Sequence, residues 1–418
     1  MPIRDDVVVI GGGLAGSMAA LSAAESGAGV RLISHKKSTL RQASGLIDVL
    51  GAVDGDAPIA DPFAALDRLP EEHPYRVVGA EGIREGLRRF DDVVGDRYLG
   101  SHTDRNALVP THGGTIKPTA RYPVSVAPGL ASAAEDTLLV GFRGLTDFDP
   151  VAAAAHLEAA GVPFDVDGAV VEFPIQFRDD ARTTRFAKAI DEDQEDVRDR
   201  LAGTVAAGID GHDRVGFPAM LGDDHGTAVR EYLEDRLGVA VFQIPTGPPS
   251  LLGMQLEDQL IDALERAEVR LSTGNPAVGY EAEDGRLTAV TVDRRGQEVP
   301  YHATEFVLAT GGLVGKGIDS DRESVSEPLF GCHVPHPEDR YEWSESEAFG
   351  DHAFARFGVV PDDDLRPTDA DSAVHFPNLR AAGGVLGGAD VAREKSAAGV
   401  SIATGTYAGR RAGEEVAQ

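Results

Sequence analysis

The fold of this chain is decided near its N-terminus by the stretch 7-VVVIGGGLAGSMAALSAAESGAGVRLIS-34. Residues 7–10 form a continuous apolar run, which is typical of a strand buried on both faces of a parallel sheet. The Ala-rich residues 14–26 predict a helix that ends at glycines, and residues 30–33 predict a second strand. The stretch therefore predicts a complete βαβ unit of about thirty residues, the unit from which nucleotide-binding α/β folds are built.

The turn between this strand and this helix carries a glycine motif. Gly11, Gly13 and Gly16 match the pattern G-x-G-x-x-G. Gly11 permits the tight turn, Gly13 lets the backbone approach a pyrophosphate, and Gly16 lets the helix pack against the strand. The helix N-terminus, with the backbone of Leu14 and Ala15, then faces the anion. The motif is weak alone, but its place in a βαβ unit predicts nucleotide binding; the alternative is a vestigial turn that binds nothing.

The second strand lacks the acidic residue that usually follows it. In dinucleotide-binding units an Asp or Glu at this place accepts hydrogen bonds from the adenosine ribose. This sequence has Ser34, His35, Lys36 and Lys37 instead. Ser34 or His35 offers a weaker substitute, and the two lysines either meet a phosphate or are simply solvated. The pattern argues against NAD and leaves FAD and a mononucleotide both open.

The composition describes a large folded chain with an acidic surface. Of 418 residues 42% are hydrophobic, which supports sizeable cores and argues against wholesale disorder. The 69 acidic and 39 basic residues give a formal charge of −30, and the acidic residues are spread along the chain. Such a surface suits high salt, where counterions screen the self-repulsion. Nucleic-acid binding is not expected, because no basic stripe is present to replace phosphate counterions.

Cysteine usage and hydropathy limit the compartment and the cofactors. Cys332 is the only cysteine, so the chain has no internal disulfide, iron–sulfur cluster or cysteine-based zinc site, and we expect no metal. A reducing, intracellular compartment fits best. No signal peptide is expected, and no apolar run reaches the roughly 18 residues of a membrane-spanning helix.

A small polar segment follows the second strand. Residues 43–50, ASGLIDVL, contain Ser44 and Gly45, which we expect to contact the cofactor through the hydroxyl group or the backbone. The alternative is an ordinary Ser/Gly turn.

A buried strand with small residues at its end lies in FVLATGG, residues 306–312. The strand ends at Thr310 and Gly311, whose small side chains leave room for a cofactor. This segment repeats the design of the first glycine turn.

The third glycine-rich segment lies near the C-terminus. Gly383 and Gly384 follow a short expected strand, and a helix is expected to begin at Gly399, with Val400 and Ser401 in its first turn. The N-terminus of that helix is suited to stabilise negative charge that develops on a flavin during reduction. Three such segments in one chain predict a flavin site more strongly than any one of them.

This whole pattern resembles flavoproteins of the fumarate reductase type, which are built on two dinucleotide-binding folds. It is more closely similar to the B subunits of anaerobic glycerol-3-phosphate dehydrogenases. The resemblance extends from residue 10 to residue 390 and is carried by the segments IGGGLAG, SGLIDVL, HPY, GLTDFDP, PPSLLGMQLEDQL, FVLATGG, SEPLFG, LRPT and NLRAAGGVLGGAD. One departure is EKSAAGVS (394–401), where a Gly/Cys-rich stretch is usual in the family.

The resemblance implies a function and partners. It implies a flavin, FMN in the usual assignment with FAD still open, and oxidation of sn-glycerol 3-phosphate to dihydroxyacetone phosphate in glycerol metabolism. The partners would be a larger FAD-containing subunit and an iron–sulfur, membrane-anchoring subunit, and electrons would pass through the flavin and the iron–sulfur subunit to quinone. The chain would then be cytoplasmic and associated with the membrane peripherally, through a partner. Two alternatives stay open: a stand-alone flavin oxidoreductase acting on another small acid, and a structural subunit with an empty flavin fold.

The expected fold class is α/β, a Rossmann-like flavin-binding domain of the two-dinucleotide-binding-fold type. Residues 1–105 and 246–418 form its two parts, and residues 106–245 form an inserted α/β substrate or cap domain. In the insert, strands are expected over 137–142, 173–177 and 214–220, and helices over 149–161 and 185–203. A β-meander is expected over 269–312, with a turn at Asp284-Gly285.

Few residues in the sequence indicate how a substrate would be bound or oxidised. Oxidation of a secondary alcohol needs a base near the hydroxyl group and cations for the phosphate. The catalytic candidates are Arg322, Glu327 and His112, and the candidates for phosphate binding are Lys117 and Arg121. Each of these residues also has an ordinary structural or surface role as its alternative. The resemblance also leaves open that the larger partner holds the substrate site.

Overall fold

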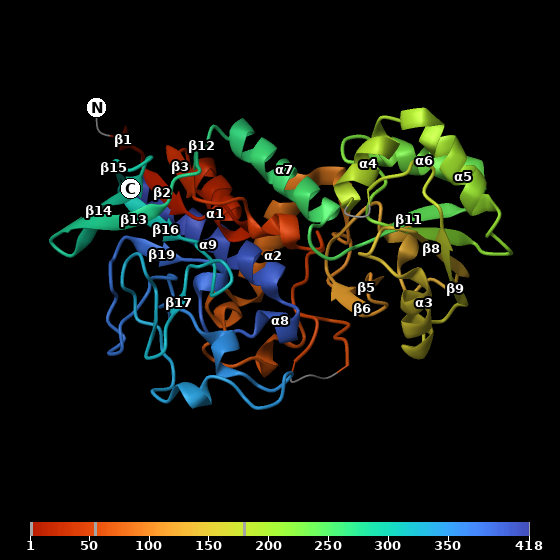
Figure 1. Cartoon of the computed structure of the whole chain (residues 1–418). Coiled ribbons are helices and arrows are strands. Elements are labelled where there is room, and N and C mark those ends of the chain that lie inside the picture. Colours follow the sequence, from red (N-terminus) through yellow and green to blue (C-terminus); the bar gives the residue numbers. More distant parts are fainter. Residues whose placement is uncertain (1–2, 54–56, 179–180, 418) are drawn as a thin grey trace. The chain divides into compact units, whose positions relative to one another are not determined.

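A computed structural model describes residues 3–53, 57–178 and 181–417 of the chain (Figure 1). The residues group into two compact units. The first comprises Met1–Thr39, Ala52–Val94 and Gln259–Gln418, and the second comprises Leu40–Gly51 and Gly95–Asp258.

The first unit is built on a five-stranded parallel sheet. Its strands, in spatial order, are β12 (Arg270–Thr273), β3 (Val30–Ser34), β2 (Val7–Ile10), β16 (Glu305–Leu308) and β19 (Leu379–Ala381). Helix α1 (Leu14–Glu25) connects β2 to β3, which confirms the predicted βαβ unit. All the strands are parallel, so their carboxyl ends meet at one edge of the sheet. The glycine-rich turns that follow β2 and β16 therefore lie at the same edge.

A second sheet in this unit has the order β1 (Ile3–Arg4), β15 (Glu298–His302), β14 (Arg286–Asp293) and β13 (Ala277–Glu283). The predicted turn at Asp284-Gly285 is confirmed, with positive φ at both residues. The prediction of one meander over 269–312 is wrong at both ends. Strands β12 and β16 pair in the parallel sheet instead, and all four residues of β16 are buried, as a central parallel strand requires.

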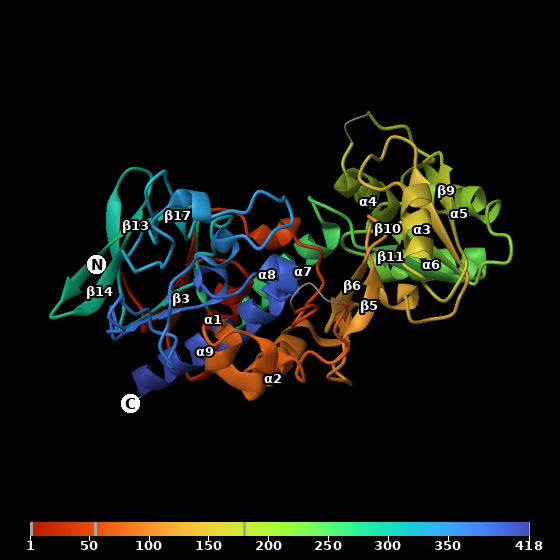
Figure 2. The same ribbon diagram turned by 90° about the horizontal axis from the view of Figure 1, so that it is seen from below.

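Three helices of the first unit pack closely together: α1, α2 (Pro74–Val94) and α9 (Ala397–Ala417) (Figures 1 and 2). Glycines allow this approach. A Cβ atom at Gly405 would lie 2.4 Å from the carbonyl oxygen of Ala15, and one at Gly409 would lie 2.1 Å from that of Ala19. Helix α9 begins at Ala397, two residues before the predicted start at Gly399.

The second unit contains a four-stranded parallel sheet in the order β11 (Ala240–Ile244), β10 (Arg214–Pro218), β8 (Thr137–Phe142) and β9 (Val166–Val171). Its helices are α3 (Pro150–Ala159), α4 (Thr183–Asp191), α5 (Val197–Ala206) and α6 (Gly226–Leu237). Buried phenylalanines from the strands and helices form its core, among them Phe142, Phe186 and Phe217. The expected α/β alternation is present.

Two details of this unit differ from the sequence prediction. The single helix expected over 185–203 is two helices, because Asp193, Glu195 and Asp196 adopt left-handed φ values and interrupt it. Residues 173–177 form no strand; Val166–Val171 pairs with β8 instead. Phe173 and Phe177 pack on Phe186 from this irregular segment.

The segment Leu40–Gly51, expected in the first part of the flavin-binding domain, packs with the second unit. Backbone hydrogen bonds join Ile47 and Arg121, and the Tyr98 hydroxyl group donates to the Gly45 carbonyl oxygen (2.7 Å). The remaining elements are α7 (Leu251–Arg266), α8 (Val391–Glu394), β4 (Tyr98–Leu99), β5 (Ala107–Pro110), β6 (Ile116–Thr119), β7 (Tyr122–Pro123), β17 (Asp319–Ser320) and β18 (Val325–Ser326). Over the described ranges, no helix has the length and apolarity to cross a membrane.

Candidate functional site

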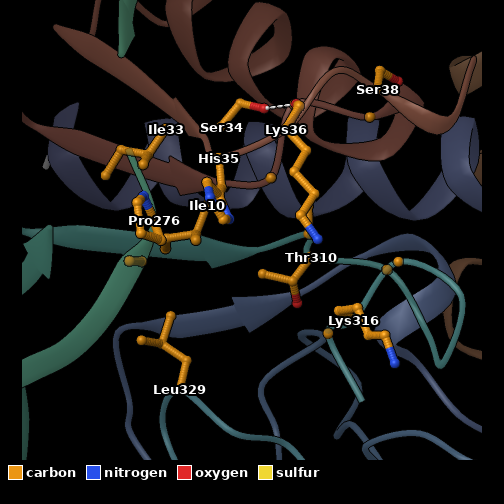
Figure 3. Close-up of a pocket in the computed structure, with 18 of the residues that line it drawn as sticks. Ile10, Ile33, Ser34, His35, Lys36, Ser38, Pro276, Thr310, Lys316 and Leu329 are labelled. Carbon is orange, nitrogen blue, oxygen red and sulfur yellow. Dashed lines mark hydrogen bonds between the residues drawn. The ribbon is translucent and has the colours of Figure 1, made fainter. Parts of the chain in front are cut away.

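A cavity of about 270 Å³ lies at the carboxyl edge of the parallel sheet of the first unit (Figure 3). Such an edge is where open α/β sheets bind ligands. The cavity is lined by Ile10, Gly11, Gly12, Gly13, Ile33, Ser34, His35, Lys36, Lys37, Ser38, Thr39, Pro276, Ala277, Ala309, Thr310, Gly311, Gly315, Lys316, Gly317, Glu327, Pro328 and Leu329. Of the predicted cofactor residues, Gly11, Gly13, Ser34, Thr310 and Gly311 are in this set.

Each glycine in the turn after β2 has different surroundings. Gly11 has φ +119°, and a Cβ atom there would lie 2.1 Å from the carbonyl oxygen of Ala309. A Cβ atom at Gly12 would lie 2.8 Å from Cβ of Ser34. Gly13 has no atom within 4 Å of the position of a Cβ atom, so its backbone faces open space. The first two glycines are thus required by packing, while the third leaves room for a ligand.

The N-terminus of α1 presents hydrogen-bond donors at this turn. Gly13 is the N-cap residue and no side chain caps the helix. The first N–H groups of a helix have no acceptor within it, and the helix dipole favours an anion at this end. Leu14 and Ala15 are buried in the first turn, and a Cβ atom at Gly16 would lie 1.8 Å from the Gly11 carbonyl oxygen. Packing of Gly16 on Gly11 therefore holds the helix end at the cavity.

The segment after β16 places an unpaired hydroxyl group at the same cavity. Thr310 Oγ1 is buried and has no hydrogen-bond partner among the described residues. Gly311 has φ +83°, and a Cβ atom at Gly317 would lie 2.3 Å from Thr310 Oγ1. A buried hydroxyl group without a partner costs free energy, and a ligand that hydrogen bonds to it removes that cost. The residues of this edge therefore fit a nucleotide cofactor.

The C-terminal glycine segment packs directly on the other two. A Cβ atom at Gly384 would lie 3.2 Å from the backbone nitrogen of Gly312. A Cβ atom at Gly383 would lie 2.6 Å from Cβ of Ala15 and 3.5 Å from Oγ of Ser401. The structure thus brings the three predicted segments together, although Gly383, Gly384 and Ser401 do not line the cavity itself.

Two further predicted residues lie in the first turn of α9. Gly399 and Val400 are both buried there, beside Ser401. They pack inside the first unit and, like Ser401, are absent from the cavity lining.

Positive charge is concentrated at this cavity. Lys36, Lys37 and Lys316 line it and are half of the six lysines in the sequence. None of the three forms an ion pair with another residue in the described ranges. Lys36 extends from the end of β3 in the direction of Thr310 (Figure 3). In a chain of net charge −30, such a cluster of cations indicates an anionic ligand.

Sequence reasoning missed several residues that line this cavity: Gly12, Gly315, Lys316 and Gly317. The last three belong to GGLVGKG, which directly continues the ATGG motif. The density of glycine in that stretch is the signal that would have found them, because repeated glycines mark close backbone approach.

Glu327 lines the cavity, but its carboxylate is committed to the backbone. Its two oxygens accept hydrogen bonds from the N–H groups of Leu329 (2.9 Å) and Phe330 (2.8 Å), and the side chain is 1% exposed. Burial, together with this carboxylate, raises the pKa of the Cys332 thiol. Arg322 is exposed in the turn between β17 and β18 and does not line the cavity.

The other predicted substrate residues belong to the second unit. The Lys117 ammonium group lies 3.4 Å from the Asp48 carboxylate, which is buried. The Arg121 guanidinium group donates to the backbone oxygens of Gly100 and Ala120, each at 3.0 Å. Both cations are thus engaged with protein groups.

His112, also in the second unit, is exposed, and its backbone N–H group donates to the Pro245 carbonyl oxygen (3.1 Å). Within the described ranges, no group of three or more His, Cys, Asp or Glu side chains stands in an arrangement for holding a metal ion.

The two residues expected to touch the cofactor from 43–50 have local roles in the second unit. Gly45 has φ +75° and a Cβ atom there would lie 2.7 Å from Cβ of Leu252. Ser44 Oγ accepts a hydrogen bond from the N–H group of Leu46 (3.4 Å). These contacts account for a small residue and a turn at these two positions.

Comparison with known proteins assigns the chain to a family. Residues 6–400 match the model of the FAD binding domain family. A protein of Halobacterium salinarum, named as the probable B subunit of an anaerobic glycerol-3-phosphate dehydrogenase, is 55% identical over 100% of this chain and 99% of its own length. The B subunit of the anaerobic glycerol-3-phosphate dehydrogenase of Pectobacterium atrosepticum is 30% identical over 96% of each chain.

A solved structure of a flavocytochrome c3 fumarate reductase in its open conformation aligns with 99% of this chain and 79% of that chain, at 11% identity and a TM-score of 0.45. This likeness is too low to support a conclusion. The family match over nearly the whole chain makes flavin the cofactor, with FAD indicated. By this match and by its full-length relatives, the chain is a flavoprotein of the FAD binding domain family and belongs to the B subunits of anaerobic glycerol-3-phosphate dehydrogenases.

Proposed function

We propose that this chain takes part, as a flavin-carrying B subunit, in the oxidation of sn-glycerol 3-phosphate to dihydroxyacetone phosphate. The observation that carries the proposal is the extent of the similarity, since the relative at 55% identity is matched over the full length, both units included. A bound flavin would supply the redox chemistry, because it can carry the two electrons that are removed from an alcohol carbon.

The residues of the first unit would hold the flavin nucleotide in three ways. Backbone N–H groups at Gly13 and the start of α1 would bind its phosphates, because they lack other acceptors and lie at the positive end of a helix. The hydroxyl group of Thr310 would hydrogen bond to the cofactor. Lys36 and Lys316 would balance its negative charge.

The chain would work together with two partner polypeptides. We propose the partners implied by the family resemblance, a larger FAD-containing subunit and an iron–sulfur subunit that anchors the complex to the membrane and delivers electrons to quinone. The sequence has a single cysteine, Cys332, and iron–sulfur clusters need several thiolates. The clusters would therefore lie in a partner, and this chain would associate with the membrane peripherally.

The place of substrate binding is a separate part of the proposal. Lys117 and Arg121 as phosphate ligands, and His112, Glu327 and Arg322 as catalytic groups, stay predictions. The contacts of three of them favour structural roles: Lys117 pairs with Asp48, Arg121 binds backbone oxygens, and Glu327 accepts two backbone N–H groups. These contacts favour a substrate site in the larger partner, with electron relay as the role of this chain.

The test is co-expression with the candidate partner subunits, followed by dye-linked oxidation of glycerol 3-phosphate. We expect turnover by the complex, no turnover by the isolated chain, and a flavin absorbance spectrum in both. Release of the flavin by acid and its chromatography distinguishes FAD from FMN. Absence of flavin from the purified chain would contradict the proposal, and turnover by the isolated chain would contradict the relay role.

A further inference from the structure

Residues 338–356 form a surface segment of the first unit that exposes aromatic side chains. We call it the aromatic loop. Its side chains of Phe349, Tyr341 and Phe354 are 99%, 85% and 41% exposed. Exposure of several large aromatic rings in one short segment is unfavourable in water and marks surfaces that bind other proteins. The chain has a net charge of −30, so an apolar aromatic cluster differs in character from the acidic surface expected around it.

The aromatic loop is held in one conformation from inside by Trp343. Its indole N–H group donates to the Pro337 carbonyl oxygen (2.8 Å), and its carbonyl oxygen accepts from the N–H group of Phe354 (3.0 Å). The indole ring also packs edge-on against the rings of His336 and Phe357, with centroids 5.8 and 5.7 Å apart. Trp343 thus anchors both ends of the loop.

A histidine closes the tip of the loop. Nδ1 of His352 accepts a hydrogen bond from the N–H group of Glu345 (3.1 Å), and Nε2 lies 3.2 Å from the carbonyl oxygen of Ala348. With Nδ1 accepting, the ring proton lies on Nε2 and donates to Ala348. The His352 ring stacks on Phe354, with centroids 5.0 Å apart. These bonds fix the turn that presents Phe349.

An ion pair ties the loop to the rest of its unit. The Asp351 carboxylate accepts from the Arg356 guanidinium group (2.5 Å), and the Arg393 guanidinium group of α8 lies 3.6 Å from it. Because the loop is already ordered, little conformational entropy is lost when a partner covers it, and such preorganised aromatic side chains are typical binding hot spots.

The charge of the loop indicates which kind of partner it fits. Residues 338–356 contain two arginines, Arg340 and Arg356, and six carboxylates: Glu338, Asp339, Glu342, Glu345, Glu347 and Asp351. Glu345 and Glu347 are exposed and precede Phe349 by four and two residues. A complementary surface carries an apolar pocket with a rim of Arg or Lys. A second copy of this chain, at net charge −30, and an anionic lipid surface would both be repelled.

We infer that the aromatic loop is the docking surface for another protein subunit of the same dehydrogenase, with Phe349 inserted in an apolar pocket that basic residues surround. The inference rests on the proposed function, because it requires that this chain works within a complex of several subunits, as the names of its relatives state. It adds three points to the proposed function: the docking surface on this chain, the residue that anchors the contact, and the positive charge of the partner's surface.

The experiment compares complexes formed by the full-length chain and its variants after co-expression with the partner subunits. Phe349→Ser is the first variant, because this nearly fully exposed side chain can be changed without loss of core packing. The matched control is Val151→Ser, which removes an apolar side chain that is 55% exposed in the second unit. Thermal unfolding and flavin content show that both variants are folded and loaded.

We expect Phe349→Ser to weaken binding to the partner by about tenfold or more, as loss of a buried aromatic anchor does, and Val151→Ser to leave it unchanged. The double substitution Glu345→Lys and Glu347→Lys is expected to slow association with the partner, and the effect should be largest at low salt. Intact complexes from Phe349→Ser and from the charge-reversed chain would overturn the inference while leaving the proposed function in place. Failure of the wild-type chain to form any complex would overturn both.

Binding to two other targets is measured on the isolated chain. Sedimentation reports self-association, and flotation with anionic lipid vesicles reports membrane binding. We expect neither for the wild-type chain. Self-association or vesicle binding that Phe349→Ser abolishes would overturn the inference, since the loop would then bind a second copy or a lipid surface.

Discussion

Ser34 donates a hydrogen bond from its hydroxyl group to the backbone carbonyl oxygen of Lys36 (2.8 Å), at the end of β3. This is the place where related dinucleotide folds have an acidic side chain for the ribose. The bond uses the donor of Ser34 and bends the chain so that Lys36, which follows it, extends along the cavity (Figure 3). At the end of β3 this chain therefore presents a cation, Lys36, where those folds have a carboxylate.

We propose from this replacement that Lys36 binds the cofactor phosphates, so reversal of its charge has a predictable effect. We expect Lys36→Glu to weaken flavin binding by about tenfold at low salt, because a repulsive charge at this exposed position beside the cavity costs about 1–2 kcal/mol. The loss should shrink as salt screens the charge. Flavin titration of the apoprotein, followed by fluorescence, measures this.

Lys188→Glu serves as the matched control for Lys36→Glu. It makes the same change of charge on an exposed side chain of α4, in the second unit, where Lys188 lies 3.5 Å from Glu192. Equal loss of flavin binding in both variants would show that the total charge of the chain, and not the position of Lys36, sets the affinity.

The unpaired hydroxyl group of Thr310 gives a prediction with two opposite readouts. Thr310→Val keeps the shape and removes a buried oxygen that has no partner in the described part of the chain. We expect the apoprotein to be equally or more stable by up to about 1 kcal/mol, and flavin binding to weaken by up to about tenfold. Thermal unfolding of the apoprotein and flavin titration measure the two effects. Loss of stability without change in affinity would show that the hydroxyl group serves the fold alone.

The sequence predicted the first unit well because its signals are local. The run Val7–Ile10, the glycine turn and the Ala-rich helix are each specified by neighbouring residues, and the parallel sheet follows from them. The three glycine segments were predicted to share a site, and contacts of Gly384 with Gly312 and of Gly383 with Ala15 bring them together.

The errors arise where partners distant in sequence decide the outcome. Strand β12 has the composition of a meander strand, yet it pairs with β3, which is more than 230 residues away. Residues 40–51 follow β3 in sequence but pack with Tyr98 and Leu252. No local sequence pattern predicts contacts between residues so far apart in the chain. The hydrogen bonds from two backbone N–H groups to Glu327 likewise depend on a turn that the sequence pattern does not predict.

Cys332 is expected to be unreactive in the folded chain. Its side chain is 3% exposed, and burial together with Glu327 raises the pKa of its thiol, so the nucleophilic thiolate is scarce. We expect no labelling of native protein by iodoacetamide at pH 8 and complete labelling after unfolding in guanidinium chloride, measured by mass spectrometry. Rapid labelling of the native chain would mean that the segment after Glu327 opens readily.

Gly11 and Gly13 are two residues apart and are expected to fail in different ways when each becomes alanine. In Gly11→Ala the new Cβ atom meets the Ala309 carbonyl oxygen at 2.1 Å and φ is +119°, so we expect unfolding to be easier by more than about 1 kcal/mol. In Gly13→Ala the Cβ atom meets nothing within 4 Å, so the apoprotein should keep its stability. The methyl group then occupies space that a phosphate needs, and flavin binding should weaken by about tenfold or more. Thermal unfolding and flavin titration separate the two cases, and full flavin affinity in Gly13→Ala would place the phosphates elsewhere.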